Sequence, residues 1–218
     1  MALLTTPEKP TTSARLAASD WTECALTVLK EAGLEAVQIT TLAKQLAVTR
    51  GSFYWHFDSR EDLLNALLAE WRARNTGVIV DAIRDVGSLD DGILALFSVW
   101  VDHTRFDPRL DQAIRDWARH DERLRKIVTA EDDARVGAIA RFFERFDYPE
   151  NEAFIRARVI YFTQISYFAL HVEDGETLTQ RMGYLDEYFL CFTGRVIDPD
   201  TADTHRSLIE RSQNDHAT

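Results

Sequence analysis

The chain has 218 residues, of which 45% are hydrophobic, 11% aromatic and 28% charged. This balance is typical of a folded globular protein and excludes a disordered or collagen-like chain. The formal net charge is −11, from 25 Lys and Arg against 36 Asp and Glu, and it argues against a general nucleic-acid coat protein.

The acidity is not evenly distributed. Residues 1–74 hold eight Lys and Arg against nine Asp and Glu, so this part is nearly neutral. Residues 38–60 contain three cations, Lys44, Arg50 and Arg60, and a single acidic residue, Asp58. The acidic excess therefore belongs to the long C-terminal part.

Cysteine usage and hydropathy indicate an intracellular protein. Cys24 and Cys191 are far apart and lack metal-ligand spacing, so we expect neither a disulfide scaffold nor a zinc finger. Residues 1–14 lack the basic start and apolar run of a signal peptide. The longest apolar-rich stretch, residues 159–172, is too short and too polar to cross a bilayer. We expect a cytoplasmic protein without a membrane segment.

The fold class is predicted to be all-α, with about nine helices, because apolar residues recur with helical periodicity and no proline interrupts residues 11–107. We expect a flexible tail (1–14), a helix-turn-helix domain (15–60), a helical effector-binding and dimerisation domain (61–197) and a polar C-terminal tail (198–218). The expected helices cover residues 19–32, 40–46, 50–57, 60 onward, 89–104, 108–120, 122–146, 149–172 and 177–193.

Two short helices joined by a tight turn predict a helix-turn-helix, whose second helix can enter the major groove. Ser19 is the expected N-cap of the first helix and Gly33 its stop, and Thr49 can cap the helix that begins at Arg50. On that helix Phe53 and Phe57 share the face expected to pack inward. The opposite face and its flanks carry Arg50, Gly51, Ser52, Tyr54, Trp55 and His56.

The segment from Thr49 to Leu64, Thr-Arg-Gly-Ser-Phe-Tyr-Trp-His-Phe-Asp-Ser-Arg-Glu-Asp-Leu-Leu, resembles the signature of tetracycline-repressor (TetR) family regulators. The preceding Gly33-Leu34 and Leu42-Ala43 pairs fit the same register. The resemblance extends over residues 21–68, roughly a fifth of the chain. The rest agrees with the family only in its helical layout.

The resemblance implies a DNA-contacting role for specific positions. Thr40 matches a contact at the start of the second helix, and Arg50, Gly51 and Ser52 match the recognition positions of the third. Tyr54, His56 and Arg60 match phosphate contacts, and Arg50 has the fork geometry that suits guanine. The full set expected to bind DNA is Thr40, Thr49, Arg50, Gly51, Ser52, Tyr54, Trp55, His56 and Arg60.

Two positions depart from the family pattern. Gln38 stands where the second helix usually opens with a capping Thr, so this helix start is expected to be less well satisfied. Ala47 stands where the turn usually has Gly. If that position needs a positive φ, Ala costs on the order of 1 kcal/mol.

The body is expected to form a homodimer. Residues 159–170 are apolar nearly all round, and residues 178–192 carry an apolar stripe, so these two helices suit a four-helix bundle across a two-fold axis. A large monomer core is the alternative. The residues expected at the interface are Ile165, Phe168, Met182, Leu185 and Phe189.

Similarity to the family also implies a pocket in the body for an unidentified small-molecule effector. For each candidate, simple core packing is the alternative, and long-range repulsion from the acidic body weakly disfavours anionic effectors. The candidates are Phe97, Trp100, His103, Thr104, Arg115, Trp117, Phe143, Tyr161 and Gln164.

The function predicted is a sequence-specific, non-enzymatic repressor of an inverted-repeat operator in double-stranded DNA, released by its effector and without a cofactor or metal. The alternative is a helical ligand-binding or adaptor dimer that has lost DNA binding. An enzyme using His103, Asp116 and His120 is a more distant reading, since the pair Asp116 and His120 alone is weak evidence for a metal.

Overall fold

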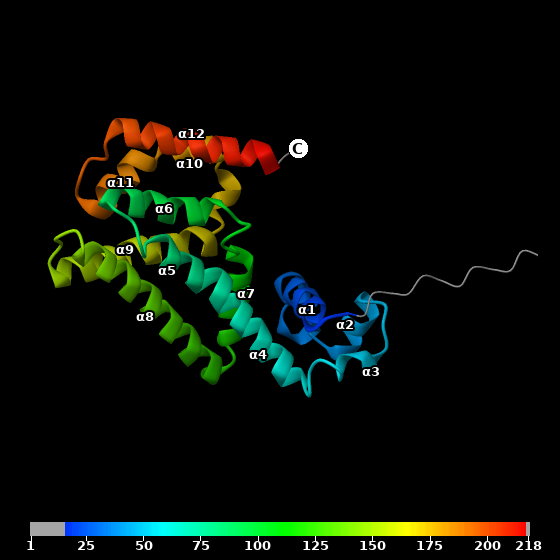
Figure 1. Cartoon of the computed structure of the whole chain (residues 1–218). Helices are drawn as coiled ribbons and strands as arrows, with labels where there is room; N and C mark the ends of the chain where they lie inside the picture. Colours follow the sequence, from blue (N-terminus) through cyan, green and yellow to red (C-terminus); the bar gives the residue numbers. More distant parts are fainter. Residues whose placement is uncertain (1–15, 217–218) are drawn as a thin grey trace, which may run out of the picture. The chain divides into compact units, whose positions relative to one another are not determined.

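The computed structural model describes residues 16–216, and within them the side chains other than those of residues 210 and 212–216. The described residues contain helices and no strand, which confirms the all-α prediction (Figure 1). The expected flexible tail, residues 1–14, lies outside the described residues. The α-helices are α1 (Ala18–Ala32), α2 (Ile39–Gln45), α3 (Arg50–Phe53), α4 (Arg60–Trp71), α5 (Val78–Ala82), α6 (Leu89–Val101), α7 (Pro108–Ala118), α8 (Glu122–Glu144), α9 (Glu150–Ala169), α10 (Leu178–Gly183), α11 (Leu185–Thr193) and α12 (Pro199–His216).

The chain divides into two compact units, Met1–Leu67 and Leu68–Thr218, so the N-terminal unit takes in the first turns of α4 as well as the expected 15–60. Here α1 begins after Ala17 rather than at Ser19, which lies inside the helix. Asp20 explains the earlier start, because its carboxylate accepts a 2.6 Å hydrogen bond from the Ala17 N–H. The helix ends as expected at Gly33, whose φ of 77° is easily adopted only by glycine.

The core of the N-terminal unit is built on the rings of Trp21 and Phe53. Both side chains are fully buried, and their centroids lie 5.2 Å apart in an edge-to-face arrangement. Phe57 also stacks on Phe53, with ring centroids 5.4 Å apart. Burial of a Phe side chain contributes about 1.5–3 kcal/mol, so Phe53 is the main anchor of the short helix α3.

In the larger unit, which we call the body, α8 and α9 follow one another and pack side by side (Figure 1). Around them α5, α6 and α11, with Ala202 of α12, contribute to one hydrophobic core. The last turn of α4 continues into a π-helical segment, Arg72–Gly77, which leads directly into α5. A π-helical segment widens the helix by one residue per turn and is frequent at functional positions.

The described residues contain twelve α-helices, more than the about nine expected for the chain, and the additional ones lie in the body. The predicted helix 177–193 is divided at Tyr184 into α10 and α11. Residues expected to be a polar tail form α12, which packs against α6 (Figure 1). Its buried side chains Ala202, His205 and Ile209 recur every three to four residues, a stripe that the low overall hydrophobicity of the segment concealed.

Among residues 16–216, no helix combines the length and the apolar character that a membrane span requires.

Candidate nucleic-acid interface

The turn between α2 and α3 depends on one residue in a left-handed conformation. Ala47 has a φ of 54°, so the positive φ anticipated for this position is present. The turn closes with a 2.9 Å hydrogen bond from the Val48 N–H to the Ala43 carbonyl. In this conformation the Cβ of Ala47 is sterically strained, which makes the turn less favourable than it would be with glycine. The turn nevertheless remains tight.

The short helix α3 presents a polar and aromatic face while Phe53 holds it to the core. Tyr54 and Trp55 are 54% and 76% exposed, and Arg50 and Gly51 are exposed as well. Ser52 and His56 are half-buried. The helix is shorter than the expected 50–57, because α3 ends at Phe53 and Tyr54, Trp55 and His56 form the turn that follows it. Within this segment Phe53 is buried while Arg50, Gly51, Tyr54 and Trp55 are exposed, as expected. Contact of these side chains with DNA remains a prediction.

Gly51 has no side chain, so it leaves the backbone on the outward face uncovered. A Cβ at this position would have only the Thr49 hydroxyl within 4 Å, so glycine is not required by the packing of the chain itself. Thr49 occupies the N-cap position with extended backbone but makes no side-chain capping bond. Its hydroxyl is therefore not committed to the helix that it precedes.

The start of α2 carries the other expected DNA contact, Thr40, whose side chain is exposed in the first turn. Gln38 occupies the N-cap position and makes no capping bond with its side chain, as anticipated. Its amide instead donates a 3.0 Å hydrogen bond to the Glu35 carbonyl. The helix start is thus less well satisfied than a Thr cap would make it.

Arg60 has a structural role that the sequence did not reveal. Its Nε donates to the Val37 carbonyl at 2.6 Å and its Nη2 to the Leu34 carbonyl at 3.0 Å. The side chain is half-buried and fixes the segment before α2 to the start of α4. A phosphate contact by Arg60 would have to use the N–H groups that remain.

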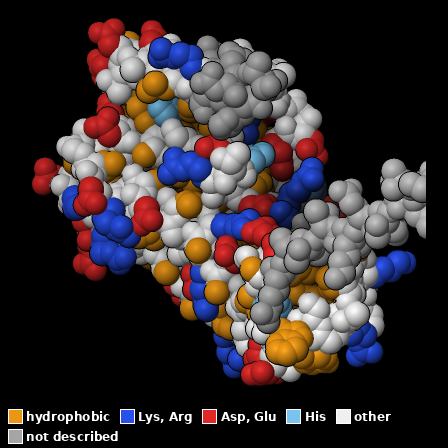
Figure 2. Space-filling model, turned by 45° about the vertical axis from the view of Figure 1, so that its right-hand side comes forward, with side chains coloured by type: hydrophobic (Ala, Val, Ile, Leu, Met, Phe, Trp, Pro, Cys, Tyr) orange, Lys and Arg blue, Asp and Glu red, His pale blue; other side chains and the backbone are white. Residues whose placement is uncertain are grey.

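Charges of both signs are intermingled on the face that Figure 2 presents, where Lys and Arg side chains are interspersed with Asp and Glu. Affinity for DNA would therefore depend on the local cations Lys44 and Arg50, both exposed, rather than on a broad basic surface.

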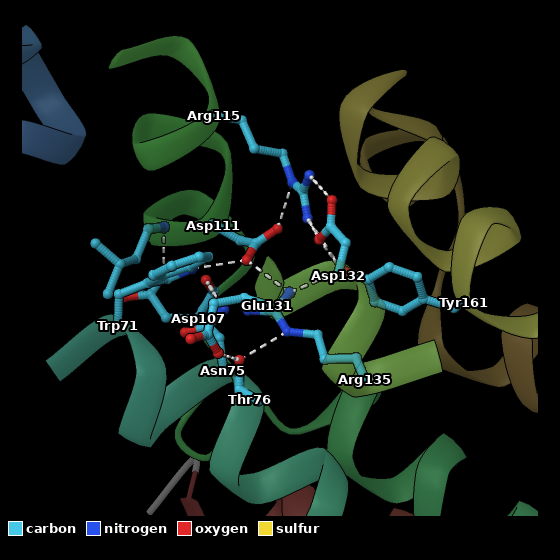
Figure 3. Close-up of polar contacts among 11 residues, drawn as sticks. Trp71, Asn75, Thr76, Asp107, Asp111, Arg115, Glu131, Asp132, Arg135 and Tyr161 are labelled. Atoms are coloured by element: carbon cyan, nitrogen blue, oxygen red, sulfur yellow. Dashed lines mark hydrogen bonds and ion pairs between the residues drawn. The ribbon is translucent and has the colours of Figure 1, made fainter. Parts of the chain in front are cut away.

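The body contains a buried polar network that joins α7, α8 and α9 (Figure 3). Arg115 binds Asp132 with two hydrogen bonds of 3.0 and 2.7 Å, and its Nε donates to Asp111 at 2.7 Å. Arg135, which is fully buried, donates to Asp111 at 3.0 Å and to the Tyr161 hydroxyl at 2.9 Å. Tyr161 in turn donates to Asp132 at 2.6 Å.

Opposite charges stabilise the ionised groups of this network. Burial alone would raise the pKa of Asp111, but the guanidinium groups of Arg135 and Arg115 outweigh burial and hold the pKa below its ordinary value. Burial raises the pKa of the Tyr161 hydroxyl despite the same two cations. Tyr161 therefore stays protonated and can act as a donor.

The network reaches the π-helical segment and the end of α4 (Figure 3). The Trp71 indole N–H donates to Asp111 at 2.8 Å, and the Asn75 amide donates to the Asp107 carbonyl at 2.8 Å. Arg135 Nε donates to the Thr76 hydroxyl at 2.9 Å. The π-helical geometry thus directs polar side chains of this segment into the body.

Sequence reasoning missed most of this network. Arg115 and Tyr161 were expected to line a ligand pocket, but their polar atoms are occupied by Asp111 and Asp132. The available signal was an Arg, Arg135, placed among the apolar positions of α8, where an unpaired charge would be very costly. Its partners lie 24 and 26 residues away in sequence, so no local spacing identified them.

A separate pocket, partly open to solvent, lies between α6, α9, α10 and α11. Of the predicted pocket residues, Phe97, Trp100 and Gln164 line it. His103 and Thr104 are instead exposed just after α6, Trp117 is half-buried on α7, and Phe143 is fully buried in the core. The residues that line the pocket are Phe97, Trp100, Val101, Thr163, Gln164, Tyr167, Glu176, Arg181, Met182, Tyr188 and Phe192.

The predicted interface residues lie in the interior of the subunit. Leu185 and Phe189 are fully buried, Met182 and Phe168 are 2% and 7% exposed, and Ile165 is half-buried against the core. They pack within their own chain, and their contribution to a dimer interface stays a prediction. The periodic stripe correctly indicated burial but did not show which surface covers it.

No group of three or more His, Cys, Asp or Glu side chains in the described part of the chain is arranged to hold a metal ion. Asp116 and His120 are both exposed, and Asp116 accepts a 3.1 Å hydrogen bond from Gln112 and pairs with Arg119.

Comparison with known proteins agrees with this geometry. Residues 22–67 match the family model of bacterial regulatory proteins, tetR family. No curated protein sequence matches the chain. Residues 22–67 hold α1 apart from its first four residues, all of α2 and α3, and the predicted DNA contacts, so the match covers the helix-turn-helix.

Solved structures share the fold over most of the chain. The ketosteroid transcriptional regulator KstR2 of Mycobacterium tuberculosis has a TM-score of 0.61 at 16% identity, covering 83% of this chain and 95% of its own. A TetR-family transcriptional regulator from Marinobacter aquaeolei VT8 has a TM-score of 0.60 at 14% identity, with 89% and 97% covered. Salmonella enterica GusR has a TM-score of 0.57 at 14% identity, with 88% and 92% covered. Residues 22–67 thus form a helix-turn-helix of the tetR family of bacterial regulatory proteins, in a chain that shares the fold of these solved regulators.

Proposed function

We propose that the chain is a repressor that binds an inverted-repeat operator as a homodimer and leaves it when a small molecule occupies the body. The observation that carries this proposal is the division of α3, in which the fully buried Phe53 anchors the helix while Arg50, Gly51, Tyr54 and Trp55 face outward. A helix held in this way can enter the major groove without rearrangement of its domain.

Each outward side chain has a chemical part in this proposal. Arg50 donates two hydrogen bonds to a guanine edge, and Gly51 lets the backbone approach the groove closely. Tyr54, His56 and the remaining N–H groups of Arg60 contact phosphates and fix the register. Thr40, Thr49, Ser52 and Trp55 complete the contact surface from α2 and α3.

The dimer is proposed to form through the apolar side chains that the subunit leaves exposed on α9. Phe154, Ile155, Val159 and Phe162 are 41–54% exposed and recur on one face of the helix. The Arg158 guanidinium lies over the rings of Phe154 and Phe162, at 5.6 and 5.5 Å. Exposed Tyr184 and Leu190 provide a similar surface on α11 and its N-terminal boundary. Two such pairs of helices would form a four-helix bundle about a two-fold axis.

The experiment that tests the proposal is selection of random duplex DNA by the purified full-length protein at about 0.15 M salt, followed by sequencing. An enriched inverted repeat supports a two-fold regulator. No enrichment by a folded, dimeric protein would instead support the adaptor alternative. A protein of this kind would act in the cytoplasm.

Two variants test whether DNA is contacted through α3 and the turn that follows it. Arg50→Ala and Tyr54→Ala should each weaken binding to the selected site by at least about tenfold without loss of folding. Arg125→Ala is the matched control, because it also removes one cation from an exposed position, but on α8 of the body. An effect of Arg125→Ala equal to that of Arg50→Ala would show that only total charge matters and would contradict the proposed contact.

A further inference from the structure

The pocket between α6, α9, α10 and α11 has an aromatic wall in which Phe192 stacks on Phe97 and on Tyr188, whose own planes are inclined by 53° to each other. Phe97 and Phe192 have centroids 6.1 Å apart and planes inclined by 30°, and Tyr188 and Phe192 are 5.5 Å apart at 29°. Trp100 meets Phe97 edge to face at 6.4 Å. Rings arranged in this way favour a flat partner, which can stack on them with an offset.

One polar group on this wall lacks a partner. The Nε2 atom of Gln164 on α9 is buried and has no hydrogen-bond partner among the described residues. A buried donor without a partner costs about 1–3 kcal/mol. Because rotation about the terminal torsion of Gln is soft, the amide can turn toward an acceptor placed in the pocket. A ligand with an acceptor oxygen would remove this cost.

The charged side chains of the pocket do not favour a ligand of either charge. Tyr167 donates a 2.7 Å hydrogen bond to Glu176, so this carboxylate already has a donor. The Arg181 guanidinium lies 4.9 Å over the ring of the same tyrosine. One carboxylate and one guanidinium therefore stand together beside Tyr167, and either sign of ligand charge would meet repulsion from one of them.

We propose that this pocket binds a neutral, flat and largely apolar molecule carrying a carbonyl-type oxygen. The ligand lies along this aromatic wall, and its oxygen accepts a hydrogen bond from Gln164. This inference rests on the proposed function, in which the body binds an effector, and it names the chemical class of that effector.

Four naphthalene derivatives of similar shape test the proposed chemical class of the ligand. They are the naphthyl methyl ketone, its isopropenyl analogue in which a methylene group replaces the oxygen, naphthoate and naphthylmethylammonium. Equilibrium dialysis against the full-length protein gives the four dissociation constants. We expect the ketone to bind most tightly. Tighter binding of naphthoate or of the ammonium compound would overturn the neutral class, and no binding by any of the four would overturn the pocket as a site for flat ligands.

Two variants separate the hydrogen bond from the aromatic wall. Gln164→Met keeps the length of the side chain and removes the donor, so it should weaken the ketone about three- to tenfold and leave the isopropenyl analogue unchanged. Phe97→Leu should weaken both compounds alike. Equal loss of both compounds in Gln164→Met would contradict the assigned role of the amide, since a general disturbance of the pocket would act in this way.

The outcome is independent of DNA binding. Selection of duplex DNA with the same preparation reports on α3, whereas dialysis reports on the body alone. A protein that selects an operator but prefers a charged naphthalene derivative would overturn the ligand class and leave the regulator standing. A protein that binds the ketone through Gln164 but selects no DNA would support the ligand class and overturn the proposed repressor.

Discussion

Arg135 on α8 donates a 3.0 Å hydrogen bond to Asp111 on α7, and the two side chains are 0% and 6% exposed. The two helices are thus joined by an ion pair that water does not reach. Arg115 and Trp71 also bond to the same carboxylate, so Asp111 is the common acceptor of three donors. A buried carboxylate with this many donors is well compensated, and removal of one donor leaves charge that no solvent can screen.

Replacement of Arg135 by Met should lower the free energy of unfolding by about 3 kcal/mol or more, because the buried Asp111 then loses one of its two neighbouring cations. Denaturant unfolding followed by circular dichroism measures the change. Arg125→Met, at an exposed position of the same helix, should change stability by no more than about 0.5 kcal/mol. If Arg135→Met lowered the free energy of unfolding by less than about 1 kcal/mol, the hydrogen bonds from Arg115 and Trp71 would be sufficient to stabilise the buried Asp111 carboxylate.

His205 on α12 should make the body less stable in mild acid. Burial, together with the nearby positive charge of Arg206, lowers the pKa of this imidazole below its ordinary value. The unfolded chain therefore takes up the proton first as the pH falls through about 6.5, and the free energy of unfolding decreases until the pH reaches the folded pKa.

The measurement is denaturant unfolding between about pH 7.5 and pH 5 for the wild type and for His205→Leu. The difference in stability between the two proteins should move in favour of the variant as the pH falls. Leu is chosen because the imidazole Nε2 is buried without a hydrogen-bond partner among the described residues. A difference that stays constant with pH would contradict the assignment.

Local patterns in the sequence predicted the N-terminal unit well. The positive φ at Gly33, the strained position of Ala47 and the two faces of α3 all follow from spacing and from the steric needs of single residues. These features are local, so a single sequence contains the information. Arg60 is the exception, because its acceptors at Val37 and Leu34 lie more than twenty residues away.

The body was predicted less well for a physical reason. Helical periodicity shows that Leu185 and Phe189 are buried, but it does not distinguish burial within a subunit from burial between two copies. The exposed apolar face of α9 became visible only when the subunit core was known. In the same way, Arg115 looked like a ligand contact until its partners Asp111 and Asp132 were placed beside it.

Gly92 on α6 should not tolerate a methyl group. A Cβ at this position would overlap with Cε2 and Cζ of Phe142, whose ring is 1% exposed and fixed in the core. An exchange of Gly for Ala inside a helix normally stabilises it by up to about 1 kcal/mol. Here overpacking should reverse the sign, and Gly92→Ala should lose about 1–3 kcal/mol in thermal or denaturant unfolding.

Gly183, the last residue of α10, is the matched control for this prediction. A Cβ there would meet no atom within 4 Å, and the residue has no positive φ. Gly183→Ala should therefore be neutral or stabilising. If Gly92→Ala were equally well tolerated, the close approach of α6 to Phe142 would be disproved.

Ala47→Gly should stabilise the N-terminal unit by about 0.5–1 kcal/mol. Glycine adopts the φ of 54° without a steric cost, and this gain exceeds the greater freedom that glycine gives to the unfolded chain. Ala66→Gly, in the interior of α4, is the comparison and should lose about 1 kcal/mol. The melting temperature of the first transition distinguishes the two, and a loss in both variants would show that the turn carries no strain.

Arg60→Met separates the structural role of this residue from a contact with DNA. The substitution removes two hydrogen bonds to the carbonyls of Val37 and Leu34, each from a charged donor, so stability should fall by about 1.5–3 kcal/mol. Arg50→Ala, at the exposed start of α3, should leave stability within about 0.5 kcal/mol of the wild type. Unfolding without DNA measures both. If Arg60→Met kept full stability and lost only DNA affinity, Arg60 would act on phosphate rather than on the fold, because a residue that fixes the segment before α2 cannot be removed without cost to the unit.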